Sequence, residues 1–384
     1  MLARIAVVGV ALGVVVMVMA ISILQGFRND ITSKVVGFGS HLTLSAYGSA
    51  NSYTETPVAL DTTLRARIRS VAGVRDLQAY ATKGGMVKTD NQIYGIVLRG
   101  YGDDCDTAFF HRSLVEGQLP FHTLSPNDVL ISTTIAAKLN LQVGDKMPTY
   151  FWQGDSYRPR ALRVCGLYNT DLADMDRIYV VGNLAVVQRL NDWDSTQAGG
   201  YEISLASFDQ LATVQSQLAP LLPYDLMLTS VRDAQPALFS WLDLLDANIL
   251  LLLVIMGVVS AVCVVSALLI MIFEKSATIG LLKALGASDA AVRRIFLRKA
   301  STLIAWGILI GNIISLLLCF IQSQWHPLTL DPDSYSMSVV PVSISPATWL
   351  LVSLGTFAVC LLATLLPAAL TARIRPAITL RSER

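Results

Sequence analysis

The sequence predicts a membrane α-helical protein with four transmembrane helices in a one-plus-three arrangement and a large α+β extracytoplasmic domain. The chain of 384 residues is 53% hydrophobic and only 15% charged, and its mean hydropathy is +0.54. These values disfavour an ordinary soluble enzyme of this size. In addition, four long stretches contain no Asp, Glu, Lys or Arg, and the charged segment 25–247 separates the first of them from the other three.

The four uncharged stretches are long enough to cross a bilayer, because a helix needs about 20 apolar residues to do so. We predict transmembrane helices over residues 1–24, 248–273, 300–321 and 347–372. A cleaved signal peptide is the alternative for the first stretch, which starts near Met1 with one positive residue, Arg4. Its apolar run is longer than that of a signal sequence, and no small-residue cleavage site ends it before Gln25, so a membrane anchor is favoured.

Lys and Arg in the short segments predict the orientation, because cationic loops resist translocation whereas long domains cross regardless of charge. The loop 274–299 carries six Lys and Arg, the tail 373–384 carries four, and Arg4 precedes the uncharged stretch 5–24 of the first span. The short loop 322–346 carries none. We therefore expect a multi-pass protein of the bacterial inner (cytoplasmic) membrane with both termini in the cytoplasm. The domain 25–247 is then periplasmic.

The domain 25–247 is large enough to bury its own core. A helix followed by a strand near each end indicates two packed α/β halves around a strand-rich insert. For the insert we predict strands over Ile93–Arg99 and Val129–Ser132, a helix over Thr133–Leu139 and a hairpin around Gln153-Gly154-Asp155. Cys105 and Cys165 also lie in this domain, where a disulfide can persist, but their spacing alone does not bring the two thiols together, and unpaired cysteines are favoured.

The joints between this domain and the spans are predicted to be helical. Phe27, Ile31 and Val35 continue the apolar spacing of the first span, and Pro236 can open a helix that runs through Trp241 into the second. No Gly/Ser-rich linker interrupts either joint, so a movement at the membrane can be transmitted outward as rigid-body motion. The alternative is that both are ordinary interfacial helix ends, with Trp241 as a headgroup anchor.

Motifs for catalysis and metal binding are absent from the sequence. It contains no phosphate loop, no H-E-x-x-H and no G-x-S-x-G elbow, so we predict no catalytic residue, no metal site and no cofactor in this chain. The spans hold no ionisable residue, which disfavours a proton- or sodium-driven transporter. Asp171, Asp174 and Asp176 cluster without a metal-loop pattern and are interpreted as a solvated turn in preference to a cation site.

The loop 274–299 has the pattern of a short amphipathic helix. Ile279, Leu282 and Leu285 recur at a spacing of three, Gly286 is a typical C-terminal stop, and Ser288 can cap the next helix. Such a helix can rest on anionic lipid or dock into a groove on a cytoplasmic partner, and the residues alone leave both open.

The run Ile279 to Ser288 resembles the coupling segment of the FtsX/MacB-type ABC transporter permeases, which dock on a separate or fused ATPase. The ending Leu365-Leu366-Pro367-Ala368, followed by Ala372, Pro376, Leu380-Arg381 and Glu383, is similar to that of the same permeases. Within this group, the lipoprotein-releasing LolC/LolE permeases of the Lol system are the most similar. The residues that carry this likeness are Gln25-Gly26-Phe27, Val115-Glu116-Gly117, Leu141 to Asp145 and Tyr335 to Val342.

The resemblance implies a permease subunit that is not itself an enzyme. Its expected partners are an ABC ATPase dimer that holds the ATP and Mg, a second permease subunit, a lipoprotein cargo, membrane lipids and a periplasmic lipoprotein chaperone, with no nucleic acid. ATP binding by the partner is expected to move the coupling helices, shift the stalks and release a lipoprotein from the inner membrane to the chaperone.

The resemblance also implies two sets of site residues. Those expected to contact the ATPase are Glu274, Lys275, Thr278, Ile279, Gly280, Leu281, Leu282, Lys283, Leu285 and Gly286. Those expected to contact lipoprotein acyl chains are Met17, Met19, Ile23, Phe27, Leu253 and Met256. The alternative for the second set is that these apolar side chains face lipid or pack inside the bundle.

The sequence departs from the family pattern in three places. Relatives carry a cytoplasmic segment before the first span, whereas this chain begins directly at Met1, and they usually have Glu where Thr278 stands here. The hairpin from Met147 to Val164 is short where the chaperone-recruiting subunit has a projecting hook, so direct chaperone capture by this chain is not expected. The alternative functions are a MacB-like mechanotransmitting efflux permease and an FtsX-like subunit that activates a cell-wall hydrolase. The large external domain argues against the second.

Overall fold

The structure is a computed structural model that describes residues 2–47, 55–89, 92–102, 105–122, 125–153, 156–330, 337 and 339–370. The chain divides into two compact units. The first consists of Met1–Asp30, Ser240–Thr329 and the chain from Val339 onward, and the second of Ile31–Phe239 with a short segment that starts at Leu330. The boundaries at residues 30/31 and 239/240 fall inside helices, α1 (Leu2–Gly39) and α9 (Pro236–Glu274), which confirms the predicted helical joints.

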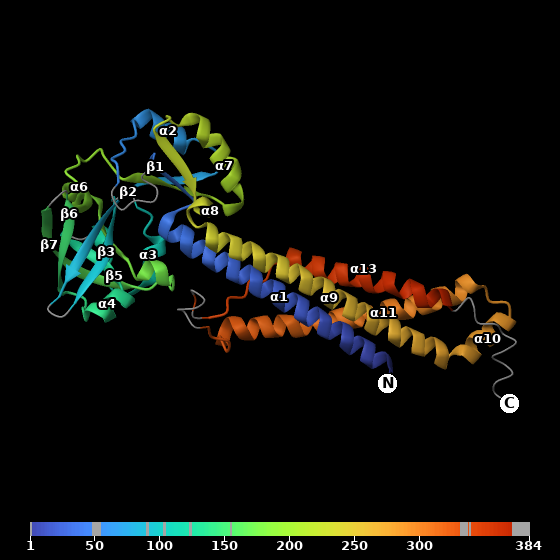
Figure 1. Ribbon diagram of the computed structural model, residues 1–384. Coiled ribbons are helices and arrows are strands. Elements are labelled where there is room, and N and C mark those ends of the chain that lie inside the picture. Colours follow the sequence, from blue (N-terminus) through green and yellow to red (C-terminus); the bar gives the residue numbers. More distant parts are fainter. Residues whose placement is uncertain are drawn as a thin grey trace. The chain divides into compact units, whose positions relative to one another are not determined.

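Four long helices make up most of the first unit. They are α1, α9, α11 (Asp289–Trp325) and α13 (Pro346–Leu370), with the short α10 (Ser276–Ala284) between α9 and α11. Each of the four long helices is long and apolar enough to cross a membrane. One precedes the second unit in the sequence and three follow it, and Figure 1 shows α9, α11 and α13 beside α1.

Helix α11 begins earlier than the span predicted from residue 300, because its N-terminus is capped outside the apolar stretch. The Ser288 hydroxyl accepts a hydrogen bond from the Ala291 amide at 3.3 Å, which satisfies one of the free N–H groups of the first turn. The basic residues between Arg293 and Lys299 therefore belong to the first turns of α11 and extend the helix beyond its apolar part.

Glycine allows α1 to approach two neighbouring helices closely. A Cβ atom added to Gly13 would collide with the Ser260 hydroxyl of α9, and one added to Gly311 of α11 would lie 2.8 Å from the Ala11 carbonyl oxygen. Gly307, one turn before Gly311, also faces α1. Small residues at such crossings bring backbones together, which favours van der Waals packing where lipid supplies no hydrophobic driving force between helices.

A ten-stranded mixed sheet forms the second unit. Its strands are β1 (Leu42–Ala46), β2 (Val74–Lys88), β3 (Ile93–Tyr101), β4 (Leu114–Gly117), β5 (Asp128–Ser132), β6 (Lys146–Gln153), β7 (Ser156–Tyr168), β8 (Tyr179–Asn183), β9 (Gly200–Leu205) and β10 (Leu226–Ser230). The order is β10-β1-β9-β2-β3-β8-β5-β7-β4, and β6 pairs with both β2 and β7. Only β3 with β8 and β5 with β7 are parallel among these pairs.

The prediction of two packed halves around an insert is wrong in one respect, since the strands form one continuous sheet. Strand β2 is 15 residues long and pairs with β9, β3 and β6, so it belongs to both regions at once. The strands and hairpin predicted for the insert are confirmed as β3, β5, β6 and β7. The predicted helix is confirmed as α4 (Thr133–Leu139), which the Ser132 hydroxyl caps by accepting from the Ile135 amide at 3.0 Å.

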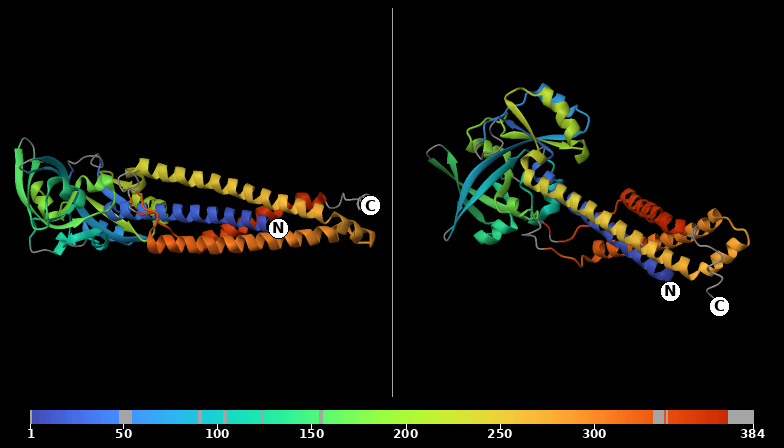
Figure 2. Two further views of the ribbon diagram at one scale, coloured as in Figure 1. Left: turned by 90° about the horizontal axis from the view of Figure 1, so that it is seen from below. Right: turned by 45° about the vertical axis from the view of Figure 1, so that its right-hand side comes forward.

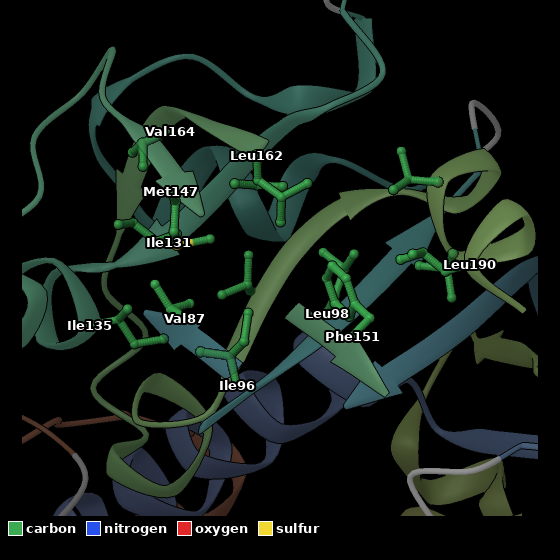
Figure 3. Close-up of a cluster of buried hydrophobic side chains, with 14 of the residues drawn as sticks. Val87, Ile96, Leu98, Ile131, Ile135, Met147, Phe151, Leu162, Val164 and Leu190 are labelled. Carbon is green, nitrogen blue, oxygen red and sulfur yellow. The ribbon is translucent and has the colours of Figure 1, made fainter. Parts of the chain in front are cut away.

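Short helices flank the sheet. They are α2 (Thr62–Arg69), α3 (Ala108–Ser113), α5 (Ala173–Asp176), α6 (Leu184–Leu190), α7 (Leu211–Leu218) and α8 (Val231–Ala234), with 3₁₀ turns at Pro120–His122, Phe208–Gln210 and Ala219–Leu221. Figure 2 shows α2 and α7 in one part of the unit and the β6–β7 hairpin in another. The apolar core between the sheet and helices α4 and α6 is drawn in Figure 3, where Leu98, Ile131 and Phe151 are fully or almost fully buried.

Candidate functional site

The loop between α9 and α11 consists of a short helix, α10, and a hydrogen-bonded turn that leads into α11. Helix α10 spans Ser276–Ala284, and Gly286 follows it with φ +96°, a backbone conformation that side chains other than glycine rarely adopt. The Ala287 amide donates to the Leu282 carbonyl at 3.0 Å, and the Gly286 amide donates to the Lys283 carbonyl at 3.0 Å. These bonds satisfy the last carbonyls of α10, so the turn into α11 is well defined.

Helix α10 is held to the bundle by one face. Ile279 is buried, and the other buried members of its cluster come from α9 and α11: Leu268, Ile272, Val292, Phe296 and Ala300. On the same side, Lys283 Nζ lies 2.9 Å from Asp289 Oδ1, which ties the end of α10 to the start of α11. The Lys283 side chain is almost buried, so its charge is neutralised within the loop by Asp289.

Three leucines at the end of α10 are exposed. Leu281, Leu282 and Leu285 are 53%, 37% and 78% exposed. Three large apolar side chains next to one another on a short helix are a common mark of a protein or lipid contact surface. We call these three residues the leucine ridge.

A groove of about 660 Å³ lies beside the leucine ridge, between α9, α10 and α11. Its lining residues are Met271, Lys275, Thr278, Ile279, Leu282, Val292, Ile295, Phe296, Arg298, Lys299 and Thr302. Leu281 and Leu285 do not line it, so only Leu282 belongs to both surfaces. Figures 1 and 2 show α10 in the bend that joins α9 to α11.

The ten residues predicted to contact an ATPase come together on α10 and its two ends, but they do not share one environment. Glu274, Lys275 and Thr278 are exposed, as is the leucine ridge, whereas Ile279 and Gly280 are buried. The two buried residues therefore fix the position of α10 in this chain, and only the exposed ones are free to touch a partner. Their roles in coupling stay predictions.

Sequence reasoning missed the cations contributed by α11. Arg298 and Lys299 line the groove together with Lys275, although more than 20 residues of chain separate them. The helical spacing of Ile295, Arg298, Lys299 and Thr302 placed them on one face of a helix. It did not show which neighbour that face meets.

The six residues predicted to contact acyl chains fall in different places. Met17 is buried in a cluster of the bundle core against which Leu253 and Met256 pack, so α1 and α9 bring these three together. Met19 lies elsewhere on α1, where its sulfur is 3.5 Å from Cys319 Sγ of α11. Met17, Met19, Leu253 and Met256 thus pack against other helices of the bundle. Packing of this kind is the alternative to cargo contact that the sequence left open. Contact with cargo stays a prediction.

Beyond the predicted spans, side-chain contacts join α1 and α9. The rings of Phe27 and Trp241 meet edge to face with centroids 5.4 Å apart, and Arg28 forms an ion pair with Asp246 at 2.5 Å. Ile23 is half-buried one turn earlier. Phe27 therefore packs against Trp241, and non-covalent contacts hold α1 and α9 together where they leave the apolar stretch.

The Gln25-Gly26 pair of α1 contacts the first turn of α13 and the segment before it. The Gln25 side-chain amide donates to the Thr348 hydroxyl at 2.9 Å, and a Cβ atom added to Gly26 would collide with the Pro341 carbonyl oxygen. The motif therefore has a packing function inside the first unit. Of the related motif Tyr335 to Val342, residues 335, 336 and 338 lie outside the described residues, as do the turn 154–155 and the C-terminal residues from 371 onward.

In the second unit, the end of α1 is set in a polar and aromatic cluster. Arg99 makes an ion pair with Glu202, and their side chains are only 11% and 1% exposed. The Arg99 guanidinium also lies 5.6 Å from the centre of the Phe38 ring and 4.7 Å from that of Tyr80, while the Tyr101 hydroxyl donates to the Phe38 carbonyl at 3.0 Å. We call this group the root of α1.

The acidic residues near Asp171 are not all solvated, which corrects the earlier interpretation. Asp176 is buried and accepts hydrogen bonds from the Thr170 amide at 3.1 Å and the Thr170 hydroxyl at 2.7 Å, and burial raises the pKa of its carboxyl. Asp171 pairs with Lys34 at 3.3 Å. Among the described residues there is no group of three or more His, Cys, Asp or Glu that can hold a metal ion.

No disulfide bond joins the two cysteines described in the second unit, Cys105 and Cys165. Cys165 Sγ donates to the Val129 carbonyl at 3.3 Å. Burial raises the pKa of the Cys165 thiol to about 12, so little reactive thiolate forms at neutral pH. These cysteines therefore add no site to the one on α10.

Comparison with known families identifies the architecture. A family model described as the MacB-like periplasmic core domain matches residues 4–221, more than half of the chain. The chain belongs to this family. A second model, described as the FtsX-like permease C-terminal domain, matches residues 226–376 and so includes α9, α10, α11 and α13. This FtsX/MacB-type permease thus has a MacB-like first part and an FtsX-like second part, as the resemblance implied.

Relatives align with this permease along nearly its whole length. The lipoprotein-releasing system transmembrane protein LolC of Xylella fastidiosa (strain Temecula1) is 25% identical over 98% of this chain and 93% of its own length. The corresponding LolE of Haemophilus influenzae is 22% identical over 100% of this chain and 94% of its own. The crystal structure of the periplasmic region of MacB from Actinobacillus actinomycetemcomitans covers 53% of this chain and 95% of that chain at 13% identity, with a TM-score of only 0.35.

Proposed function

We propose that this permease releases lipoproteins from the inner membrane to a periplasmic chaperone, as a subunit of an ATP-driven ABC transporter. The observation that carries the proposal is the alignment of the whole chain, spans and sheet unit together, with proteins named for lipoprotein release. A partial match would have left either the membrane part or the sheet unit unassigned.

In this proposal the orientation follows the distribution of Lys and Arg. The basic residues around α10 lie in the cytoplasm, the ten-stranded sheet lies in the periplasm, and the helices cross in a one-plus-three arrangement. The termini are cytoplasmic. The leucine ridge then faces the compartment that contains ATP, where a soluble partner can reach it.

The proposed mechanism is mechanical transmission from a separate ATPase dimer that binds ATP and Mg. The exposed residues of α10 dock on the ATPase through the leucine ridge, and Ile279 and the Lys283–Asp289 pair carry the movement into α9 and α11. The Phe27–Trp241 and Arg28–Asp246 contacts keep α1 and α9 together as they leave the membrane. Rigid helices transmit such a displacement better than a flexible linker does.

The cargo step is proposed to occur between this chain and a second permease subunit. The acyl chains would contact α1 and α9 near Met17, Leu253 and Met256, of which Met17 is buried and the other two are partly exposed. A movement of α1 and α9 together would then exclude the chains and pass the lipoprotein to the chaperone. This chain supplies the lever and part of the pocket wall, and the ATPase supplies the free energy.

The test of the proposed function is depletion of this protein followed by separation of the two membranes of the cell. Outer-membrane lipoproteins should accumulate in the inner membrane, and re-expression of the wild-type chain should restore their sorting. A chain that carries Leu281→Asp and Leu285→Asp should not restore it. Normal sorting in the depleted cells would exclude lipoprotein release as the function.

A MacB-like mechanotransmitting efflux permease is the second candidate, because the MacB-like core model matches the first part of the chain. It differs in its cargo and needs a periplasmic adaptor. Depleted cells would then sort lipoproteins normally but become more sensitive to drugs or peptides. The same depletion strain therefore distinguishes the two functions.

A further inference from the structure

The groove beside the leucine ridge has two chemically different parts. Its floor is apolar and includes Met271 of α9 and Ile295 and Phe296 of α11. Lys275, Arg298 and Lys299 add three positive charges, and no described Asp or Glu lines the groove. No ion pair joins any of these three cations to another residue in the part of the chain that the structure describes.

Two helix faces meet at the groove. Lys275, the N-cap residue of α10, and Thr278 and Leu282 of α10 follow one another at spacings of three and four. On α11, Ile295 and Thr302 flank the cations at a spacing of seven. Residues so spaced lie on one side of a helix. The groove is therefore a built feature of the α10–α11 packing, and its volume is within the range of about 300–1,000 Å³ typical of ligand sites.

The position of the cations along α11 indicates where the groove lies in a membrane. Arg298 and Lys299 directly precede the uncharged stretch that starts at residue 300, so in the proposed orientation they lie at the inner surface of the bilayer. At that depth an apolar floor meets acyl chains, and a cationic rim meets headgroups.

We propose that this groove binds one anionic phospholipid of the inner leaflet. The phosphate is held by Lys275, Arg298 and Lys299, and the acyl chains lie on Met271, Ile295 and Phe296. An anionic lipid satisfies both the charge and the apolar surface of the groove, whereas a soluble acidic peptide satisfies only the charge. The orientation, but not the shape or charge of the groove, rests on the proposed function.

The bound lipid would add contacts that hold α10 against α11. Thr278 and Leu282 of α10 line the groove together with Ile295 and Thr302 of α11, and a lipid in the groove would contact both helices. Two of the three leucines of the ridge remain available, because Leu281 and Leu285 do not line the groove. Lipid and ATPase are thus expected to occupy α10 at the same time.

Native mass spectrometry of the full chain in a neutral detergent tests the proposal. After removal of endogenous lipid, the protein is titrated with dioleoyl phosphatidylglycerol or with dioleoyl phosphatidylcholine. Each cation near a membrane surface contributes about 1 kcal/mol to binding an anionic lipid, so the three together should favour phosphatidylglycerol on the order of 100-fold. A variant with both Arg298→Gln and Lys299→Gln should lose most of this preference.

A matched control loses the same charge from the same helix. Arg293→Gln with Arg294→Gln removes two exposed cations that do not line the groove, and it should keep the preference for phosphatidylglycerol. Equal affinity for the two lipids, or equal losses in the two double variants, would overturn the proposal. So would displacement of the lipid when the ATPase is added, because the groove would then be part of the ATPase contact.

The proposed lipid site and the proposed function can be refuted independently of each other. Leu281→Asp with Leu285→Asp should abolish docking of the ATPase and leave phosphatidylglycerol binding intact. If depleted cells sort lipoproteins normally while the purified chain still prefers phosphatidylglycerol, the function is wrong and the lipid site stands.

Discussion

Helix α10 and the root of α1 are held by opposite kinds of contact. On α10 one buried isoleucine and one ion pair fix the helix, and three leucines remain exposed. At the root of α1, Phe38 is buried and Arg99 is enclosed by an acidic partner and aromatic rings. The first region has spare apolar surface for a partner, whereas the second has its polar groups matched inside the fold. This difference supports the proposed docking role of α10 and predicts that the root of α1 is rigid.

The largest effect on stability is expected at the root of α1. Arg99→Ala leaves the Glu202 carboxylate buried, and among the described residues its remaining side-chain partner is the Gln78 amide, which donates to it at 2.6 Å. Removal of one member of a buried ion pair typically costs about 3–5 kcal/mol. Thermal unfolding of the full chain in detergent should show a large fall in the midpoint. A change no larger than that of an exposed ion pair would mean that the root is not rigid.

The matched control for that variant is the exposed pair Arg158–Asp192, whose atoms are 2.7 Å apart. Water and salt screen such pairs, so Asp192→Asn should leave the unfolding midpoint nearly unchanged. If both substitutions gave the same fall, burial would not be the source of the stability of the root.

A second, smaller effect is expected where α1 meets α11. Gly311→Leu places a side chain against the Ala11 backbone, and overpacking of this kind typically costs about 1–3 kcal/mol. Gly355→Leu in α13 is the control, because an added Cβ atom there has open space around it. Thermal unfolding should separate the two variants. Equal effects would show that the glycine contact between α1 and α11 does not stabilise the bundle.

Features that depend on neighbouring residues in the sequence were predictable, whereas contacts between distant residues were not. The membrane helices were predictable because each one corresponds to a single continuous stretch of the sequence without Asp, Glu, Lys or Arg. Helix α4 was predictable because Ser132 and Asn140 mark its two ends. Contacts between distant residues were not predictable. Arg99 and Glu202 are about 100 positions apart, and the strand order that joins β3 to β9 through β2 leaves no local signature.

The candidate site was predictable only in part for the same reason. The leucines of α10 follow one another in the chain, so their exposure on a short helix could be expected. The groove depends on the packing of α11 against α10, which no local pattern encodes. Ile279 was assigned to the contact surface by resemblance, but burial places it on the inner face.

A pH-dependent effect is expected at the start of β1, close to the root of α1. Burial, assisted by the charge of Arg75, lowers the pKa of His41 from 6.5 to about 4, and its Nδ1 accepts a hydrogen bond from the Leu205 amide at 3.1 Å. Between these pH values the unfolded chain binds more protons than the folded one, so stability falls as the pH falls from 6.5 to 4. The loss should be about 1–2 kcal/mol, since the ring is partly exposed and screened.

Unfolding midpoints of the full chain measured at several pH values check this effect. Replacement by His41→Gln removes the titrating group, and the part of the pH dependence between 6.5 and 4 that the histidine contributes should disappear. An unchanged profile in the variant would assign the acid sensitivity to other groups.

The smallest effect on stability is expected on α10 itself. Leu285→Asp changes an exposed side chain, and surface substitutions usually alter the unfolding free energy by no more than about 0.5 kcal/mol. Ile279→Asp, only six positions earlier, buries an unpaired carboxyl and should be clearly destabilising. The two unfolding midpoints measured side by side sharpen the contrast between the outer and inner faces of the helix. A destabilising Leu285→Asp would mean that the leucine ridge is part of the fold.

The most direct test of the account is ATP hydrolysis by the reconstituted transporter with Leu281→Asp and Leu285→Asp in this chain. The permease should stimulate its ATPase partner in the wild-type complex, and the double variant should lose most of that stimulation while its sheet unit stays folded. The purified chain without the ATPase should hydrolyse no ATP. Full stimulation by the double variant, or turnover of ATP by this chain on its own, would contradict the proposal that it is a lever driven through α10.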